Sequence, residues 1–130
     1  MKLIKAFYID VEAQTVSELH VVLRLDNFHY FLKGERITLF CLGEEAEFML
    51  YLNSQNFKRK KVGFFKLNEL SEELYPGNAI LVSLDTNFYK SLVFEDMKIE
   101  ITEFTKSVTF YRPNQVSDMD IKAKAKQNFK

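Results

Sequence analysis

The stretch Tyr75-Pro76-Gly77-Asn78-Ala79-Ile80-Leu81-Val82-Ser83-Leu84-Asp85 decides the fold. Pro76 fixes φ at the first central position of a turn and Gly77 accepts a positive φ at the second, so the pair predicts a type II corner. No charge follows until Asp85, and a short, branched run without charge is typical of a strand buried on both faces. We therefore expect residues 79–84 to form the central strand of a sheet.

The length and composition are typical of one packed domain. Of 130 residues, 13 are Phe and 6 are Tyr, with 4 Gly and no Trp. This length supports one hydrophobic core, and this aromatic content is typical of a folded chain. We expect a globular α+β domain over residues 1–112 and a basic tail over residues 113–130 that is flexible or ordered by a partner.

Charge and cysteine content narrow the class of protein. The 18 Lys and Arg balance the 18 Asp and Glu, so the net charge does not favour a general polyanion binder. Cys41 is the only cysteine, which excludes an intrachain disulfide and a thiolate metal site within one chain. No uncharged run approaches the roughly 18 residues that cross a bilayer, and no signal-peptide core is present. We expect a soluble cytoplasmic protein without a cofactor.

Apolar runs predict two hairpins in the first half of the chain. Residues 3–9 and 15–23 are rich in β-formers and close enough to pair as antiparallel strands. Residues 36–42 and 46–53 flank Gly43-Glu44-Glu45, which predicts a second hairpin with a charged tip. The strands of this second hairpin are apolar on both faces, so each face should be covered.

Residues 26–33 change to a helical period. Apolar residues fall at i, i+3 and i+4 from Phe28, which predicts a short helix packed on the sheet. Asp26 is suited to accept bonds from the first free amides, and Gly34 to close the helix in the left-handed conformation.

The second half mixes strand and helix patterns. Residues 57–67 read as a strand with a basic first half, and residues 88–93 as another strand. Between Phe94 and Val108 the apolar residues fit both periods; we favour a helix from about Glu95 to Thr105, followed by a strand over 107–111. The sequence thus predicts a mostly antiparallel, aromatic-rich sheet of about seven strands with one or two short helices.

Four short motifs follow one another in an order that covers most of the chain. They are Lys5-Ala6-Phe7-Tyr8-Ile9-Asp10, Gly63-Phe64-Phe65, Gly77-Asn78-Ala79, and Glu95-Asp96 leading to Val108-Thr109-Phe110. This order resembles small domains of unknown function encoded by phages and mobile elements of bacteria. Such domains often have a Gly-rich turn after the central strand, where this chain has Asp85-Thr86-Asn87. The resemblance implies a mobile-element accessory protein and assigns no role to any residue.

No set of residues in the sequence predicts catalysis. His20 and His29 have neither the H-x-x-x-H nor the H-x-E spacing of zinc sites. Cys41 lies in an apolar run without a neighbouring His or Lys, which favours a small buried hydrophobe over a nucleophile. Nucleophile-elbow, dinucleotide and phosphate-loop motifs are absent from the sequence. We expect no enzyme activity and no metal site.

One segment combines cations with aromatic rings: Phe57, Lys58, Arg59, Lys60, Lys61 and Phe64. Sheet-based binders of single-stranded nucleic acid hold phosphates with cations and stack bases on rings. Lysines also protect exposed edge strands from pairing with other chains, so the same residues have a purely structural interpretation. Binding of single strands through residues 57–65 is our alternative functional hypothesis.

The surplus of apolar strands supplies the leading hypothesis. Two short helices cannot cover both faces of a sheet of about seven strands, and uncovered apolar faces usually meet a partner. We expect a homo-oligomer, preferably a twofold dimer, or a dedicated host protein target. The leading hypothesis is a non-enzymatic interaction protein, such as a phage or mobile-element accessory factor that binds and sequesters a host component.

Overall fold

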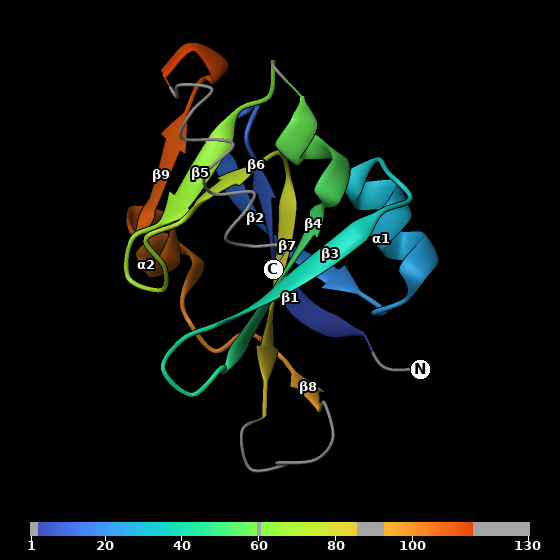
Figure 1. Cartoon of the computed structure of the whole chain (residues 1–130). Helices are drawn as coiled ribbons and strands as arrows, with labels where there is room; N and C mark the ends of the chain where they lie inside the picture. The colour runs from blue at the N-terminus through green and yellow to red at the C-terminus, as the bar shows by residue number, and fades with distance from the viewer. Residues whose placement is uncertain (1–2, 60, 86–92, 116–130) are drawn as a thin grey trace.

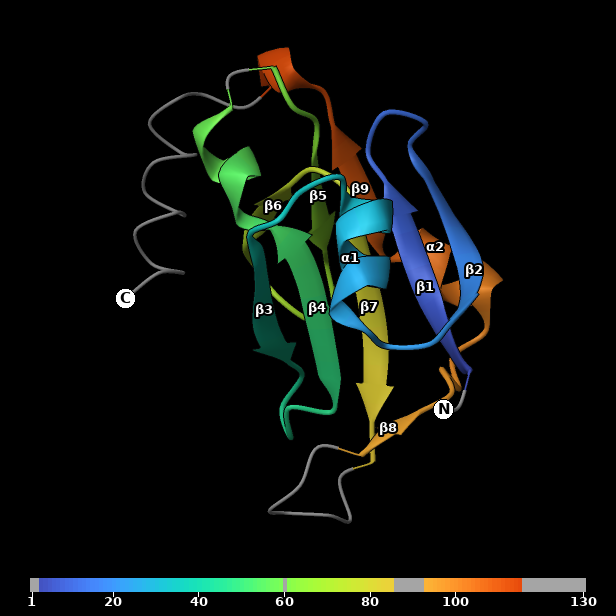
Figure 2. The same ribbon diagram turned by 90° about the vertical axis from the view of Figure 1, so that its right-hand side faces the viewer.

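Two antiparallel sheets pack against each other in the computed structural model, which describes residues 3–59, 61–85 and 93–115 (Figures 1 and 2). The larger sheet contains β1 (Ile4–Asp10), β2 (Thr15–Val21), β3 (Ile37–Leu42), β4 (Phe48–Asn53), β7 (Ala79–Leu84) and β8 (Phe94–Glu95). The smaller sheet contains β5 (Phe64–Leu67), β6 (Leu74–Pro76) and β9 (Val108–Tyr111). The helices are α1 (Leu25–Leu32) and α2 (Ile101–Lys106), with 3-10 turns η1 (Ser54–Lys58) and η2 (Pro113–Gln115). The predicted α+β class with mostly antiparallel sheet is confirmed.

Strand β7 is the centre of the larger sheet, as its sequence predicts. The strand order is β2-β1-β7-β4-β3, with β8 pairing on β7 as well. All six residues of β7 are buried, because β1 and β4 flank its edges and other elements cover both faces. Gly77 has a φ of 84°, the positive value that the corner before the strand requires, while Pro76 ends β6.

The second sheet corrects the prediction of one sheet of about seven strands. Its Phe65, Leu67 and Tyr75 pack with Phe7 and Leu81 of the larger sheet in one core. Strands β5, β6 and β9 therefore cover one face of the larger sheet from within the same chain. Most of the apolar surplus that suggested a partner is buried by this sheet. Among the described residues, the large apolar side chains that remain exposed are Leu3, Leu25, Tyr30 and Leu39.

Helix α1 covers the other face of the larger sheet. Phe28 stacks on Tyr51 of β4 with ring centroids 4.2 Å apart, and Leu32 is buried beside it. The helix was predicted correctly, but its ends differ from the prediction. Arg24 is the N-terminal cap residue, and it is Lys33 that adopts the left-handed conformation at φ 54°. Glycine follows one residue later because a Cβ at Gly34 would collide with the amide of Asn53.

The predicted strand over 57–67 is wrong in its first half. Asn53 starts a 3-10 turn by accepting a hydrogen bond from the Gln55 amide at 3.0 Å, and this turn continues to Lys58. The strand begins only at Phe64, after the chain has crossed to the second sheet. The Asn53 side chain accepts a backbone hydrogen bond that a continuing strand would give to a neighbouring strand, and Asn commonly does this at turns.

The predicted helix over 95–105 is also shorter than expected. Glu95 belongs to β8, and the amide of Met97 donates to the carbonyl of Lys5 at 2.9 Å, so this segment continues along the sheet. Helix α2 starts at Ile101 and brings the Phe104 ring to 4.8 Å from Phe7. The strand expected over 88–93, apart from its last residue, and the tail from residue 116 onward lie outside the described residues.

Candidate anion-binding pocket

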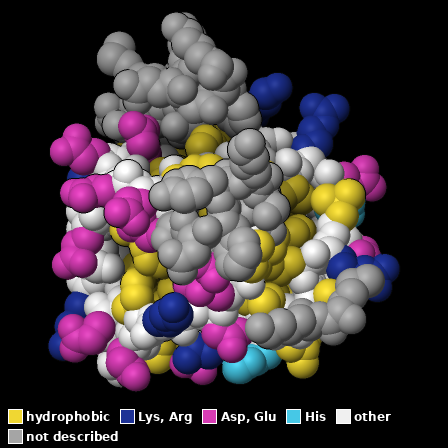
Figure 3. All heavy atoms as spheres, turned by 90° about the horizontal axis from the view of Figure 1, so that it is seen from below, with side chains coloured by type: hydrophobic (Ala, Val, Ile, Leu, Met, Phe, Trp, Pro, Cys, Tyr) yellow, Lys and Arg dark blue, Asp and Glu magenta, His cyan; other side chains and the backbone are white. Residues whose placement is uncertain are grey.

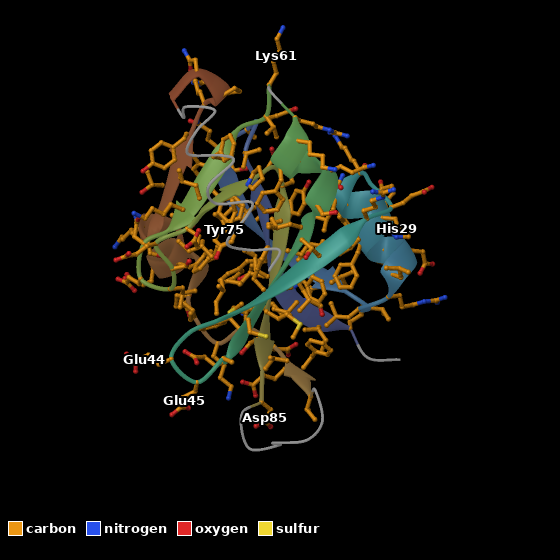
Figure 4. The ribbon with its side chains drawn as sticks, viewed as in Figure 1. His29, Glu44, Glu45, Lys61, Tyr75 and Asp85 are labelled. Atoms are coloured by element: carbon orange, nitrogen blue, oxygen red, sulfur yellow. The ribbon has the colours of Figure 1, made fainter. Side chains whose placement is uncertain are left out.

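A pocket with a volume of about 350 Å³ has among its lining residues Lys61, which lies at the upper end of the molecule in Figure 4. Five parts of the chain meet there: the turn after β1, the end of α1, the segment from η1 to β5, the β6–β7 corner and the end of β9. The lining residues are Val11, Glu12, Leu32, Lys33, Asn56, Arg59, Lys61, Val62, Gly63, Gly77, Asn78, Arg112 and Pro113. This volume is in the range of about 300 to 1,000 Å³ that is usual for small-ligand sites.

Four cations from three separate segments line the pocket, and all are exposed. Lys33 ends α1, Arg59 and Lys61 follow η1, and Arg112 follows β9. Glu12 is the carboxylate among the lining residues, so the excess charge is positive. We call these cations, Lys33, Arg59, Lys61 and Arg112, the basic rim.

Four charged residues mark the two ends of the molecule. Lys61 lies at the upper end, whereas Glu44, Glu45 and Asp85 lie at the opposite end (Figure 4). The view from below shows carboxylates gathered along one side of that lower face (Figure 3). Although the net charge is zero, the cations that line the pocket outnumber the one carboxylate among its described lining residues, so the attraction of an anion is local to the pocket.

The end of α1 is tied to η1 by the side chain of Asn53. Its Nδ2 donates to the carbonyl oxygens of Leu32 and Lys33 at 3.5 and 3.4 Å, and its Oδ1 accepts from Gln55. Asn53 is 1% exposed, so this link is shielded from water. It fixes the backbone of Lys33 beside the turn that leads to Arg59.

The floor of the pocket is held by contacts between backbone and amide groups. The amide of Gly77 donates to the carbonyl of Gly63 at 2.9 Å, which joins the β6–β7 corner to the segment before β5. Asn78 accepts from the Val11 amide at 2.9 Å and donates to the Tyr8 hydroxyl at 2.8 Å. Burial raises the pKa of Tyr8, so its hydroxyl keeps its proton and donates to the Phe31 carbonyl.

Asn56 differs from the other amides of this region. It is 5% exposed and lines the pocket, yet its side chain makes no hydrogen bond to any residue that the structure describes. Its amide oxygen and nitrogen are not enclosed by the protein, so they face the water of the pocket. The unused donor and acceptor of Asn56 are therefore available to a ligand in the pocket.

The structure assembles only part of the segment that the sequence singled out. Arg59 and Lys61 line the pocket, and exposed Lys58 immediately precedes them. Lys60 lies outside the described residues. Phe57 and Phe64 are buried at 7% and 2% exposure, so neither ring offers a face on which a base can stack.

Sequence reasoning missed Lys33, Asn56 and Arg112. Lys33 and Arg112 are far from residue 59 along the chain, and only the fold brings them to the same pocket. Asn56 stands in a polar turn that resembles any other loop. The sequence Pro76-Gly77-Asn78 predicts a corner, and two of its residues, Gly77 and Asn78, also line the pocket.

The remaining candidates from the sequence lie elsewhere. His20 is exposed on β2 and His29 is half-buried in α1, and no group of His, Cys, Asp and Glu in the described part of the chain could hold a metal ion. Cys41 was predicted to be buried and is exposed. It lies on β3, which pairs with β4 alone among the strands that the structure describes.

Comparison of the chain with known proteins finds no match. No family model matches it, no curated protein matches its sequence, and no solved structure matches its fold. Within the described residues, neither helix has the length and apolar character needed to cross a membrane.

Proposed function

We propose that this protein is a non-enzymatic binding protein that holds the phosphates of single-stranded nucleic acid on the basic rim. The observation that carries the proposal is the convergence of Lys33, Arg59, Lys61 and Arg112 on one pocket from three segments of the chain. Packing of the hydrophobic core does not explain why cations from distant parts of the sequence lie close together. They are the arrangement with which proteins neutralise a phosphate backbone.

The two types of cation suit phosphate in different ways. A guanidinium such as that of Arg59 is a planar fork that can bind two phosphate oxygens at once, whereas Lys33 and Lys61 act as mobile point charges. All four side chains belong to exposed residues, so each contact is weakened by water and salt. Binding through them should therefore be modest and strongly dependent on salt.

The burial of the aromatic rings separates this site from sheet-based stacking platforms. With Phe57 and Phe64 in the core, the phosphates must supply most of the affinity. The strand would cross the end of the protein where Lys61 lies and leave the end with Glu44 and Glu45 free of contact (Figure 4). This refines the alternative hypothesis by replacing residues 57–65 with the basic rim.

The hypothesis of an interaction protein stays a prediction, together with its homo-oligomer, host target and mobile-element origin. This hypothesis was based on apolar sheet faces that the helices could not cover. The second sheet covers one of these faces, so most of that support is lost. The proposed cytoplasmic location likewise stays a prediction. The basic rim gives the nucleic-acid proposal a specific set of residues.

Fluorescence anisotropy with a labelled single strand of about ten nucleotides tests the proposal. Binding measured between about 50 and 200 mM salt should weaken as salt rises, with a slope of log K against log salt near −3 for four phosphate contacts on a single strand. Lys61→Gln and Arg59→Gln should each reduce the magnitude of this slope by about 0.7.

Lys98→Gln is the matched control, since Lys98 is an exposed lysine that pairs with Glu95 and does not line the pocket. This variant should bind as the wild type does. The proposal is wrong if the wild type fails to bind at low salt, or if Lys98→Gln weakens binding as much as Lys61→Gln.

A further inference from the structure

We propose that the floor of the pocket accepts one nucleobase and that Asn56 pairs with the edge of that base. The inference rests on the proposed function, since it requires that the basic rim hold the phosphates beside the base. It assigns a role to the one amide of the pocket floor that the fold itself does not use.

The three buried or half-buried asparagines of this region divide by their partners. Asn53 bonds to Leu32, Lys33 and Gln55, and Asn78 bonds to Val11 and Tyr8. The side chains of Asn53 and Asn78 each link separate segments of the chain, and these hydrogen bonds explain why the two amides are buried or half-buried. Asn56 is 5% exposed, against 1% for Asn53, but its side chain contributes no hydrogen bond among the described residues.

An amide side chain is chemically suited to a base. It presents a donor and an acceptor side by side, and this pairing matches the edge of a nucleobase in a bidentate contact. Proteins that recognise single strands commonly take an unstacked base into a site of this kind and bond its edge. A phosphate alone could use only the donor of Asn56.

The surroundings of Asn56 fit a flat ring. Val11, Leu32, Val62 and Pro113 line the same pocket and offer apolar contact for the faces of a base. Gly77 carries no side chain, and the Asn56 amide occupies the space that a Cβ there would take, so the glycine lets this amide lie in the lining of the pocket. The exposed cations stand at the opening, where the sugar and phosphates attached to such a base would lie.

Binding of two labelled polymers separates the base contact from the phosphate contact. The first is an ordinary single strand, and the second is an abasic strand of the same length that keeps sugars and phosphates. The wild type should bind the ordinary strand about tenfold more tightly, as expected for one bidentate contact. Asn56→Leu should lose this preference and bind both strands as the wild type binds the abasic one.

Two further variants control for the fold. Gln55→Leu changes the neighbouring exposed residue of η1, which does not line the pocket, and should keep the preference. Asn56→Ala removes the amide with a smaller side chain, so it repeats the test if leucine does not fit. Thermal unfolding should show that Asn56→Leu is at least as stable as the wild type, because no internal hydrogen bond is lost.

The possible outcomes distinguish the two proposals. If the wild type binds both strands equally and with strong salt dependence, the basic rim stands and the base contact is overturned. If the preference persists in both Asn56 variants, Asn56 is not the residue that makes it. If neither strand binds at low salt, the proposed function and this inference fail together.

Discussion

Asn56 lies directly against the backbone of Gly77. A Cβ on Gly77 would collide with Nδ2 of Asn56 and come within 2.7 Å of its Cγ. Gly34 and Asn53 show the same relationship, because a Cβ on Gly34 would collide with Nδ2 of Asn53. Two glycines thus give space to two asparagines of the β4–η1 segment, one that holds the fold together and one that faces the pocket.

Gly77→Ala should destabilise the protein by about 3 kcal/mol. Part of this cost arises because φ at residue 77 is 84°, a conformation that alanine adopts with strain. The rest arises because the methyl group displaces the Asn56 side chain. Urea unfolding followed by circular dichroism measures the free energy of unfolding of this variant against the wild type.

A double-mutant cycle with Asn56→Ala separates the two causes. In the Asn56→Ala background the collision is relieved and only the backbone strain remains, so Gly77→Ala should cost about 1 to 2 kcal/mol less than in the wild type. If the cost is the same in both backgrounds, the contact between Gly77 and Asn56 does not limit the choice of residue.

The stability of the protein should fall above about pH 10, and Tyr51 should contribute to this fall. Burial, followed by the nearby Cys41, raises the pKa of Tyr51 to about 12. An unfolded tyrosine ionises near pH 10, so above that pH the unfolded state binds fewer protons and gains stability relative to the folded state. The loss continues until the folded pKa is reached. Burial raises the pKa of Tyr8 and Tyr75 as well, with the same sign.

Tyr51→Phe tests this contribution and keeps the ring that stacks on Phe28. Its free energy of unfolding should match the wild type near pH 7 and decline less steeply between about pH 10 and 12. Urea midpoints measured across this range provide the comparison. Identical declines in the two proteins would mean that Tyr51 ionises equally in both states.

Cys41 should react with a thiol reagent in the folded protein. Cys41 is exposed on β3, so Ellman's reagent should modify one thiol per chain without denaturant. The rate of this reaction should be near that of the unfolded protein. Cys41→Ser, which removes the only thiol, is the blank for this measurement. Protection of the thiol that increases with protein concentration would instead indicate that β3 is covered by another copy of the chain.

The sequence identified the elements whose signals are local. The central strand was recognised from the charge-free run that ends at Asp85, and α1 from the helical spacing that starts at Phe28. These patterns depend on neighbours within a few residues. The division into two sheets depends on whether β5 pairs with β4 or with β9, and no local pattern decides this.

The candidate site was less predictable than the fold for the same reason. The sequence indicated Arg59 and Lys61 because they belong to a dense basic run. It placed Phe57 and Phe64 in the same candidate site, but both rings are buried in the hydrophobic core. Burying a Phe side chain stabilises a protein by about 1.5 to 3 kcal/mol, more than an exposed ring gains from a chance ligand. The predicted burial of Cys41 failed because periodicity does not show which strand is at an edge.

Lys33→Gly should change stability and binding in opposite directions. Lys33 adopts a left-handed conformation with φ 54° and ψ 45°, which costs a residue with a side chain about 1 kcal/mol and a glycine nothing. The substitution should therefore stabilise the protein by up to that amount. It also removes one cation of the basic rim, so the slope of log K against log salt for a single strand should lose about 0.7 in magnitude.

Ala46→Gly is the matched control for Lys33→Gly. Ala46 has a similar φ of 55° in the β3–β4 hairpin, whose tip carries Glu44 and Glu45 at the end of the molecule opposite Lys61 (Figure 4). This variant should gain comparable stability without any change in binding. If Lys33→Gly were equally neutral for binding, Lys33 would not contact phosphate and its backbone strain would have no functional reason. If both variants gain stability and only Lys33→Gly loses salt dependence, the strain at Lys33 is the cost of placing a cation on the basic rim.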